Sequence, residues 1–471
     1  MSQTSHRNAV PFSQKVAFGI GMLANQMFPA ALGVFMIVLI EGLGMSPFLW
    51  GLIFFLPKLI DAITDPLMGY ISDHTQSRWG KRRPYVFIGA IIAGCSYMIM
   101  WQVYESNSEM YNFLYFLGWS CVFWIGMTIF GVPFVAMGYE MSDDFHERTR
   151  IMAVSQWIGQ WAWVIVPWFW VILDPSFGWF ESMSAGARDL SLWVGAGCML
   201  LAIVPAIFCT QTANDGKNQQ QLEKHSLTDS IKDFGRGIVV TLRNKPFQKI
   251  CIATFFIFNA FNIVASFSYF IITHYVQVGT VWVAAYGAAS ALCTTFIVIP
   301  IINHLSQIYG KKLTFLCSQA ISILGYILLW WGFSPEIPWL MFLPLPLFAC
   351  GIGGLFTLMM SMTADVCDLD ELETSKRREG TFGAIYWWMV KFGGAFGGLA
   401  TGAILSFIGY DGSAAAHSTA TLDLMRLSYI IVPCIGTILA ILIMRNYDLD
   451  ETKANQIRSE LEARKSGQAS A

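Results

Sequence analysis

Charged side chains are scarce in this sequence. Only 13% of its 471 residues are Asp, Glu, Lys or Arg, whereas 55% are hydrophobic. A typical soluble domain carries about 25% charged residues. The chain also contains repeated apolar runs of about 20 residues, the length that an α-helix needs to cross a membrane. The composition therefore excludes a water-soluble protein and indicates an integral membrane protein.

Paired cysteines are also absent. The ten cysteines are scattered singly, without a CxxC pair, so we expect neither disulfides nor a cysteine metal site. The formal net charge of −2 argues against a nucleic-acid partner. Residues 1–14 are polar and precede no short apolar core with a cleavage site, so we expect the first hydrophobic run to stay as a membrane span.

Twelve apolar runs follow one another in two groups of six. They lie at 16–40, 48–72, 84–104, 111–139, 152–173 and 190–210, and at 247–277, 281–303, 313–333, 338–364, 381–409 and 425–446. The expected organisation is an N-terminal six-helix half at 1–210, a cytoplasmic linker at 211–245, a C-terminal six-helix half at 246–446 and a cytoplasmic tail at 447–471. The tail sequence KANQIRSELEARK is typical of a short amphipathic helix.

Lysine and arginine are distributed unevenly between the two sides that this layout defines. Of the 29, 24 fall in the termini and in loops on one side, and only Arg188 falls in a loop on the other. Because loops rich in Lys and Arg stay in the cytoplasm, both termini are predicted to be cytoplasmic. The expected location is the cell membrane, which is the inner membrane in a Gram-negative cell.

An internal repeat supports two equivalent halves. Gly80-Lys81-Arg82, after the second run, is echoed 230 residues later by Gly310-Lys311-Lys312, after the eighth. Two six-helix halves in parallel orientation are the organisation of major facilitator transporters, whose site lies between the halves near mid-membrane. The predicted fold is therefore an all-α integral membrane protein of the major facilitator type, with twelve transmembrane helices.

One stretch, from Lys58 to Pro84, combines apolar sequence with ionisable residues. Lys58, Asp61 and Asp65 are spaced i, i+3 and i+7, so they share one face of a helix. Ionisable residues at membrane depth are costly and usually face a partner or a wet cavity. A carboxylate pair in the membrane, followed by a basic cytoplasmic loop, indicates a cation-coupled carrier.

Several motifs in both halves resemble one transporter family, the glycoside–pentoside–hexuronide:cation symporters, whose best-known member is the bacterial melibiose carrier. They are DAITDPLMGYISD with SRWGKRRP, GMTIFGVPF, DDFHERTR, ADVCDLDELETSKRREG, MVKFGGAFGG and IGYDGSAAAHSTATLDLMR. The resemblance implies that Asp61 and Asp65 bind the coupling cation, with Thr64 between them and Thr128 nearby. It places Lys58 one turn earlier and Lys391 facing the cation site.

The same resemblance assigns a cytoplasmic gate. Arg148 matches a gate arginine, and Asp365 and Asp368 match its acidic partners in the other half. Arg377 belongs to the basic run across the pseudo-symmetry axis from Arg148. Opposite charges there would close the cytoplasmic side and separate as the halves rock. The alternative is ordinary solvated loop charge.

The sequence departs from the melibiose carrier at four substrate-side positions. The carrier's fourth-helix aspartate is Gly131 here, and its neighbouring tryptophan is Val135. Its fifth-helix arginine falls at Gln156, and its first-helix acidic residue falls near Ala24-Asn25. Melibiose is therefore not the expected substrate. The candidate substrate-binding residues are polar or aromatic residues deep in the spans: Gln156, Gln160, Trp387, Asn259 and Asn262.

Two readings of the carboxylate pair stay open, a coupling site and a structural ion pair such as Asp61 with Lys391. Carboxylate oxygens suit a hard cation, so the coupling ion is Na⁺, held by Asp61 and Asp65, or H⁺. Lys391 would hold the carboxylates when no cation is bound. No cofactor other than this ion is expected.

The predicted function is cation-coupled symport of a sugar, glycoside or uronate, by a protein that is not an enzyme. One alternative is a cation-coupled carrier of an amphipathic lipid such as a lysophospholipid, because aromatic residues without sugar-binding charges suit an acyl chain. A more remote alternative is an intramembrane Mg²⁺-dependent transferase, whose clustered aspartates lie at a wet membrane edge. The expected partners are a small-molecule carbohydrate and the lipid bilayer. The oligomeric state stays open, and a monomer is compatible with the sequence.

Overall fold

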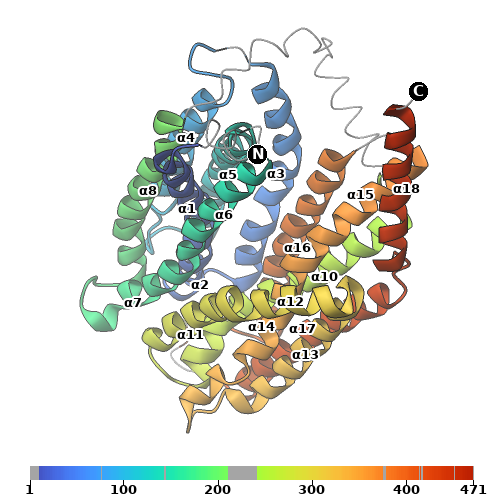
Figure 1. The fold of residues 1–471 in the computed structure, drawn as a ribbon. Coiled ribbons are helices and arrows are strands. Elements are labelled where there is room, and N and C mark those ends of the chain that lie inside the picture. The colour runs from blue at the N-terminus through green and yellow to red at the C-terminus, as the bar shows by residue number, and fades with distance from the viewer. Residues whose placement is uncertain are drawn as a thin grey trace. The chain divides into compact units, whose positions relative to one another are not determined.

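The computed structural model describes residues 10–75, 77–142, 145–209, 241–374, 378–412, 414, 417–449 and 451–469. These residues form helices and connecting loops, and none of them lies in a strand (Figure 1). The chain divides into two compact units. The N-terminal unit comprises Met1–Lys232 with Asp411–Ala415, and the C-terminal unit comprises Asp233–Tyr410 with Ala416–Ala471.

The helices of the N-terminal unit follow the six apolar runs of the first group. They are α1 (Phe12–Phe35) with α2 (Ile37–Glu41), α3 (Pro47–His74), α4 (Arg83–Met100), α5 (Glu109–Glu140), α6 (Phe145–Ile165) continued by η1 (Val166–Trp168) and α7 (Phe169–Leu173), and α8 (Met183–Phe208). The short helix η2 (Pro175–Phe177) lies before α8. Helix α1 packs on α6 and α8, and α5 packs on α3 and α4.

The helices of the C-terminal unit follow the second group. They are α10 (Lys245–Phe270) with η4 (Ile271–Tyr275), α11 (Thr280–Cys293) with η5 (Thr294–Val298) and α12 (Ile299–Tyr309), α13 (Lys311–Gly332), η6 (Pro338–Phe342) with α14 (Leu345–Gly354), η7 (Leu355–Met359) and α15 (Met360–Thr374), α16 (Glu379–Phe407), α17 (Thr419–Arg445) and α18 (Glu451–Ala469). The segments η4, η5 and η7 are π-helical turns. Helix α10 packs on α16 and α17, and α13 packs on α14 and α17.

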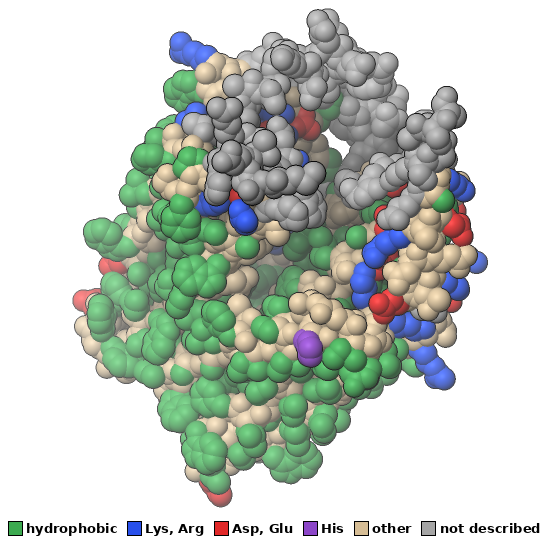
Figure 2. Space-filling model, in the orientation of Figure 1, with side chains coloured by type: hydrophobic (Ala, Val, Ile, Leu, Met, Phe, Trp, Pro, Cys, Tyr) green, Lys and Arg blue, Asp and Glu red, His purple; other side chains and the backbone are tan. Residues whose placement is uncertain are grey.

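Eleven of the described helical segments are long and apolar enough to cross a membrane. The predicted span at 152–173, now α6 to α7, is not among them, because α6 begins with charged residues and carries Gln156 and Gln160. Hydrophobic side chains are spread widely over the described surface that Figure 2 shows, and charged ones gather at few places on it. The predicted all-α membrane fold is therefore confirmed, with one helix more polar than the rest.

The starts of several membrane helices are set by the same local chemistry. Ser46, Ser108 and Ser182 each accept a hydrogen bond from the backbone N–H three residues later, at the first turns of α3, α5 and α8. In the C-terminal unit Asn244 and Ser418 do the same for α10 and α17. Such caps satisfy N–H groups that have no partner within the helix, a need that is greatest near lipid.

Equivalent helix pairs in the two units pack closely through glycine. A Cβ on Gly89 of α4 would collide with the backbone of Ile129 and Phe130 on α5. A Cβ on Gly325 of α13 would collide in the same way with the backbone of Leu347 and Phe348 on α14. Small residues let membrane helices approach closely where no hydrophobic effect drives them together. The repeat seen in the basic loops thus extends to the packing.

Candidate cation-coupling and substrate site

Helix α3 carries the two candidate coupling carboxylates into the N-terminal unit. Asp61 is only 2% exposed, and its neighbour one turn later is Asp65. Their helix packs along α5, which brings Thr128 opposite them. A bare carboxylate is unstable in so dry a place, so it has to be protonated, paired or bound to a cation.

Thr128 is the point where the candidate coupling residues meet. Its Oγ1 lies 2.8 Å from Asp61 Oδ1 and 3.0 Å from Asp65 Oδ1. Thr64 Oγ1 lies 3.2 Å from Thr128 Oγ1. It also donates to the backbone carbonyl of Ile60 at 3.1 Å. The structure thus brings together all four residues that the sequence predicted for cation coupling.

These four side chains form an oxygen cluster with few protons. A threonine hydroxyl has one hydrogen and can donate to only one carboxylate at a time, and an ionised carboxylate only accepts. The carboxylates of Asp61 and Asp65 and the hydroxyls of Thr64 and Thr128 therefore offer more hydrogen-bond acceptors than donors among themselves. A cluster of this kind is stabilised by an added proton or by a hard cation bound to oxygen.

Lys58 lies one turn before Asp61 on α3, as the sequence predicted. Its Nζ is 4.0 Å from Asp61 Oδ2, the outer limit of a direct ion pair. The same Nζ lies over the ring of Trp124 on α5, 2.9 Å from the ring centroid. The lysine is thus shared between a carboxylate and an aromatic face.

A second polar group lies one turn further along α5. Gly131 follows Thr128 by three residues, so both lie on one face of the helix. A Cβ on Gly131 would come within 3.2 Å of Asn25 Oδ1 on α1. The first-helix position and the fourth-helix position, both of which lack the acidic residue of the melibiose carrier, are therefore neighbours in the structure.

The amide of Gln26 connects α1 to α6. Its Nε2 donates to Gln156 Oε1 at 3.0 Å, and its Oε1 accepts from Trp163 Nε1 at 3.0 Å. Gly159 makes room for this contact, because a Cβ there would lie 2.7 Å from Gln26 Nε2. Gln160 is half-buried on the same helix and is not one of the residues that these bonds join. We call Asn25, Gln26, Gln156 and Trp163 the amide–indole group.

The predicted substrate residues of the C-terminal unit lie on α10 and α16. Gly393, Gly394 and Gly397 of α16 pack against the part of α10 that holds Asn259 and Asn262. Asn262 donates to the carbonyl of Phe258 at 2.8 Å, a bond within its own helix. Trp387 is 46% exposed, and Lys391 is half-buried one turn later. The predicted link between Lys391 and the carboxylates of α3 stays a prediction.

The predicted gate residues have partners within their own units. Arg148 donates to the backbone carbonyl of Ser142 at 2.8 Å. Asp365 binds Lys311 at 2.6 Å and Arg458 at 2.5 Å, and Asp368 lies 3.4 Å from Arg458. Arg377 lies outside the described residues. The predicted pairing of Arg148 with the two aspartates stays a prediction.

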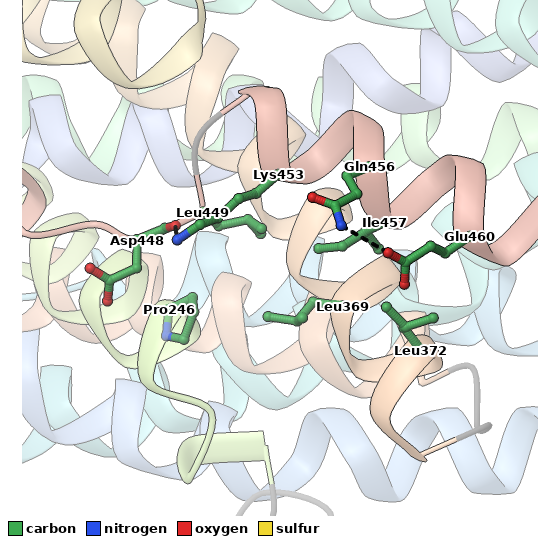
Figure 3. Close-up of a pocket in the computed structure, with 9 residues that line it drawn as sticks. All are labelled: Pro246, Leu369, Leu372, Asp448, Leu449, Lys453, Gln456, Ile457 and Glu460. Atoms are coloured by element: carbon green, nitrogen blue, oxygen red, sulfur yellow. Dashed lines mark hydrogen bonds between the residues drawn. The ribbon is translucent and has the colours of Figure 1, made fainter.

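A pocket of about 380 Å³ lies in the C-terminal unit, between the starts of α10 and α18 and the end of α15 (Figure 3). It is lined by Pro246, Leu369, Leu372, Asp448, Leu449, Lys453, Gln456, Ile457 and Glu460. None of the predicted substrate residues lines it. In the described part of the chain, no group of three or more His, Cys, Asp or Glu side chains is arranged to hold a metal ion.

Sequence reasoning alone missed Gln26, Trp124 and Arg458. Gln26 stands beside Asn25 and is one of few amides in an apolar span, which is the signal that should have selected it. Trp124 carries no such signal, because it is one of 18 tryptophans and only the packing of α3 on α5 brings it to Lys58.

Long apolar helices in two repeated units, with the buried Asp61 and the half-buried Asp65 on a membrane helix of the N-terminal unit, are typical of a multi-pass membrane transporter. The family described as MFS/sugar transport protein matches residues 17–451. The chain therefore belongs to this family of the major facilitator superfamily, and its resemblance to the glycoside–pentoside–hexuronide symporters is confirmed.

Individual relatives are distant but cover nearly the whole chain. An isoprimeverose transporter of Lactiplantibacillus pentosus is 24% identical over 464 residues, which is 96% of this chain and 92% of the relative. A glucuronide carrier protein homolog of Escherichia coli (strain K12) is 23% identical over 462 residues, 96% of this chain and 95% of the relative. The inward-open structure of the xylose transporter XylE from E. coli is similar in fold, with a TM-score of 0.63, 12% identity and coverage of 95% of this chain and 99% of that one.

Proposed function

We propose that this protein is a secondary active transporter that couples the uptake of a sugar or glycoside to the entry of Na⁺ or H⁺. The observation that carries the proposal is the oxygen cluster around Thr128, in which the buried Asp61 and the half-buried Asp65 share one hydroxyl on the helices of a membrane unit. Relatives described as an isoprimeverose transporter and a glucuronide carrier homolog support a carbohydrate substrate.

The amide–indole group is the proposed contact with the substrate. Amide and indole groups of Gln26, Gln156 and Trp163 donate and accept hydrogen bonds without carrying charge. Sugar hydroxyls can exchange with such bonds, because each hydroxyl both donates and accepts. The aromatic face of Trp163 adds a flat apolar surface of the kind on which a sugar ring stacks.

Helix α5 contacts both groups, the oxygen cluster through Thr128 and the amide–indole group through Gly131, which is why we propose that they are coupled. Thr128 touches the carboxylates, and Gly131, one turn later, lies beside Asn25. A cation that neutralises Asp61 and Asp65 would remove repulsion within α3 and favour one arrangement of α3 and α5. If that arrangement also presents the amide–indole group, cation and sugar bind better together than separately, and this differential affinity is the coupling.

We further propose that both termini are cytoplasmic. The proposal rests on the 24 Lys and Arg residues of one side against the single Arg188 of the other. A reporter fused after Arg188 should report the outside, and one fused within 215–240 should report the inside. The opposite pattern would overturn the orientation.

The function is tested by uptake into proteoliposomes under separate Na⁺ and H⁺ gradients. The panel should hold neutral glycosides, a uronate and a lysophospholipid, so that a lipid carrier would be recognised. We expect one cation gradient to drive accumulation of a neutral sugar. Accumulation of none of the carbohydrates, or uptake of the lysophospholipid alone, would refute the proposal.

Asp65→Asn separates coupling from transport. The variant keeps the shape of the side chain but removes its charge, so we expect gradient-driven accumulation to be lost while downhill exchange of the sugar continues. Asp61→Asn should behave alike. Glu109→Gln, at the exposed start of α5, is the matched control and should accumulate sugar as wild type does. Accumulation by Asp65→Asn as steep as in wild type would place the coupling site elsewhere.

A further inference from the structure

Lys58 lies between two groups that both attract its charge. Its Nζ is 2.9 Å from the centroid of the Trp124 ring and 4.0 Å from Asp61 Oδ2. Its side chain is only 18% exposed, so water screens neither attraction well. A desolvated ammonium over an indole face is held by the electrons of the ring.

The two helices place these partners side by side. Lys58 precedes Asp61 by three residues on α3, and Trp124 precedes Thr128 by four on α5. Because Thr128 is hydrogen-bonded to Asp61, one helical turn back along both helices brings Trp124 to Lys58. Helical side chains lean toward the N-terminus of their helix, so Lys58 leans away from Asp61 and toward the turn where Trp124 lies.

The position of this ammonium decides how open the oxygen cluster is to a cation. With Nζ on the ring, Lys58 competes less with an incoming ion for Asp61. With Nζ moved fully onto Asp61, the lysine would occupy the place of that ion and would have to be displaced.

We propose that Trp124 is a positioning residue for cation coupling, which keeps the Lys58 ammonium away from Asp61 and thereby sets the affinity for the coupling ion. The inference rests on the proposed function. It assigns a role to a tryptophan that belongs neither to the oxygen cluster nor to the amide–indole group. Lys58 then competes with the coupling ion for Asp61. The indole ring of Trp124 limits this competition, because it attracts the ammonium away from the carboxylate.

The test measures the cation concentration that gives half-maximal sugar transport in proteoliposomes of the full-length protein. Trp124→Leu removes the aromatic face, so Lys58 is released onto Asp61 and the half-saturating concentration should rise roughly five- to tenfold. Trp124→Phe keeps a weaker face and should give a smaller rise. Lys58→Gln removes the competitor and should lower the half-saturating concentration.

The double variant separates positioning from packing. In Lys58→Gln/Trp124→Leu no ammonium is left to compete, so the half-saturating concentration should return to that of Lys58→Gln alone. A packing defect caused by Trp124→Leu would persist in the double variant and would overturn the inference. If Trp124→Leu does not fold, the pair Trp124→Phe and Lys58→Gln/Trp124→Phe decides by the same comparison.

The same assay distinguishes failure of the inference from failure of the proposed function. If wild-type transport depends on neither cation, the proposed function is wrong and the inference falls with it. If wild type is cation-dependent, Asp65→Asn abolishes this dependence and Trp124→Leu leaves the half-saturating concentration unchanged, only the role of Trp124 is wrong.

Discussion

Arg458, on the C-terminal helix α18, donates to the buried carboxylate of Asp365 on α15 at 2.5 Å. Lys311, at the start of α13, donates to the other oxygen of the same carboxylate at 2.6 Å. Lys312, the next residue, bonds to the backbone carbonyl of Tyr447 at 2.8 Å instead. Asp365 is thus held by one cation from the repeated basic motif and one from the tail.

The N-terminal unit forms the equivalent contact without a tail. There Glu140, at the end of α5, binds both Lys81 at 2.9 Å and Arg82 at 2.7 Å, the two cations of its own motif. Arg458 is thus the second cation on Asp365 in the C-terminal unit, as Arg82 is the second cation on Glu140 in the N-terminal unit. Helix α18 packs on α15 with Ala454, Ile457 and Leu461 buried, which makes it a part of the C-terminal unit (Figure 1).

Arg458→Ala should lower the stability of the C-terminal unit. It leaves the buried Asp365 with Lys311 alone, and because Arg458 is about half exposed the expected loss is small, about 1 kcal/mol. Thermal unfolding of the full-length protein in detergent measures this loss. Arg464→Ala is the matched control, since Arg464 on the same helix donates to the backbone carbonyl of Leu372 rather than to a carboxylate. Equal unfolding temperatures for the two variants would contradict the role of Arg458.

Thr128→Val should weaken cation binding more than Thr128→Ser does. Valine keeps the shape of threonine but removes the oxygen shared by Asp61 and Asp65, whereas serine keeps that oxygen. Loss of one hydrogen bond to a charged group costs about 1.5–3 kcal/mol, so the half-saturating cation concentration should rise at least about tenfold in the valine variant. Equal values for the two variants would show that the hydroxyl has no part in coupling.

Gln26→Leu should raise the KM for the sugar while leaving the cation requirement in place. The change removes both the donor to Gln156 and the acceptor from Trp163 without altering charge. Gln102→Leu is the control amide, just after α4, where its side chain bonds to the carbonyls of Met98 and Arg188. A KM increase of the same size in both variants would indicate a general defect rather than a substrate contact.

Stability should fall at acid pH through Glu147. Its carboxylate lies 2.6 Å from Lys15 Nζ and 3.0 Å from the backbone N of Val10, and these bonds, that of Lys15 first, hold the pKa of Glu147 below its ordinary value of 4.5. A lowered native pKa stabilises the fold at pH values above 4.5, and this stabilisation is lost as the pH falls from 4.5 through the native value.

Glu147→Gln should therefore be less stable than wild type at neutral pH and should lose less stability between pH 6 and pH 3.5. Thermal unfolding in detergent across this range measures both effects. Glu181→Gln, in an exposed loop, is the control and should follow the wild-type profile. A Glu147→Gln profile parallel to that of wild type would remove this residue from the acid response.

The sequence by itself determined the membrane helices, their order and the four residues that the structure brings together around Thr128. Long apolar runs in a chain with few charges have no other stable state than membrane helices, because lipid leaves backbone groups no other partners. Asp61 and Asp65 stand out for the same reason, since a carboxylate inside such a run is too costly to lack a function. The i, i+3 and i+7 spacing then placed Lys58 on their face before any packing was known.

Only the tertiary structure decided which residues of different helices meet. The hydrogen bond between Gln26 and Gln156 joins residues 130 positions apart. The cation–π contact of Lys58 with Trp124 depends on the packing of α3 along α5. Arg458 reached Asp365 because α18 folds back onto α15, which the amphipathic pattern of the tail does not specify. Periodicity defines the face of a single helix, whereas the partner of that face is set by the close packing of all helices in the unit.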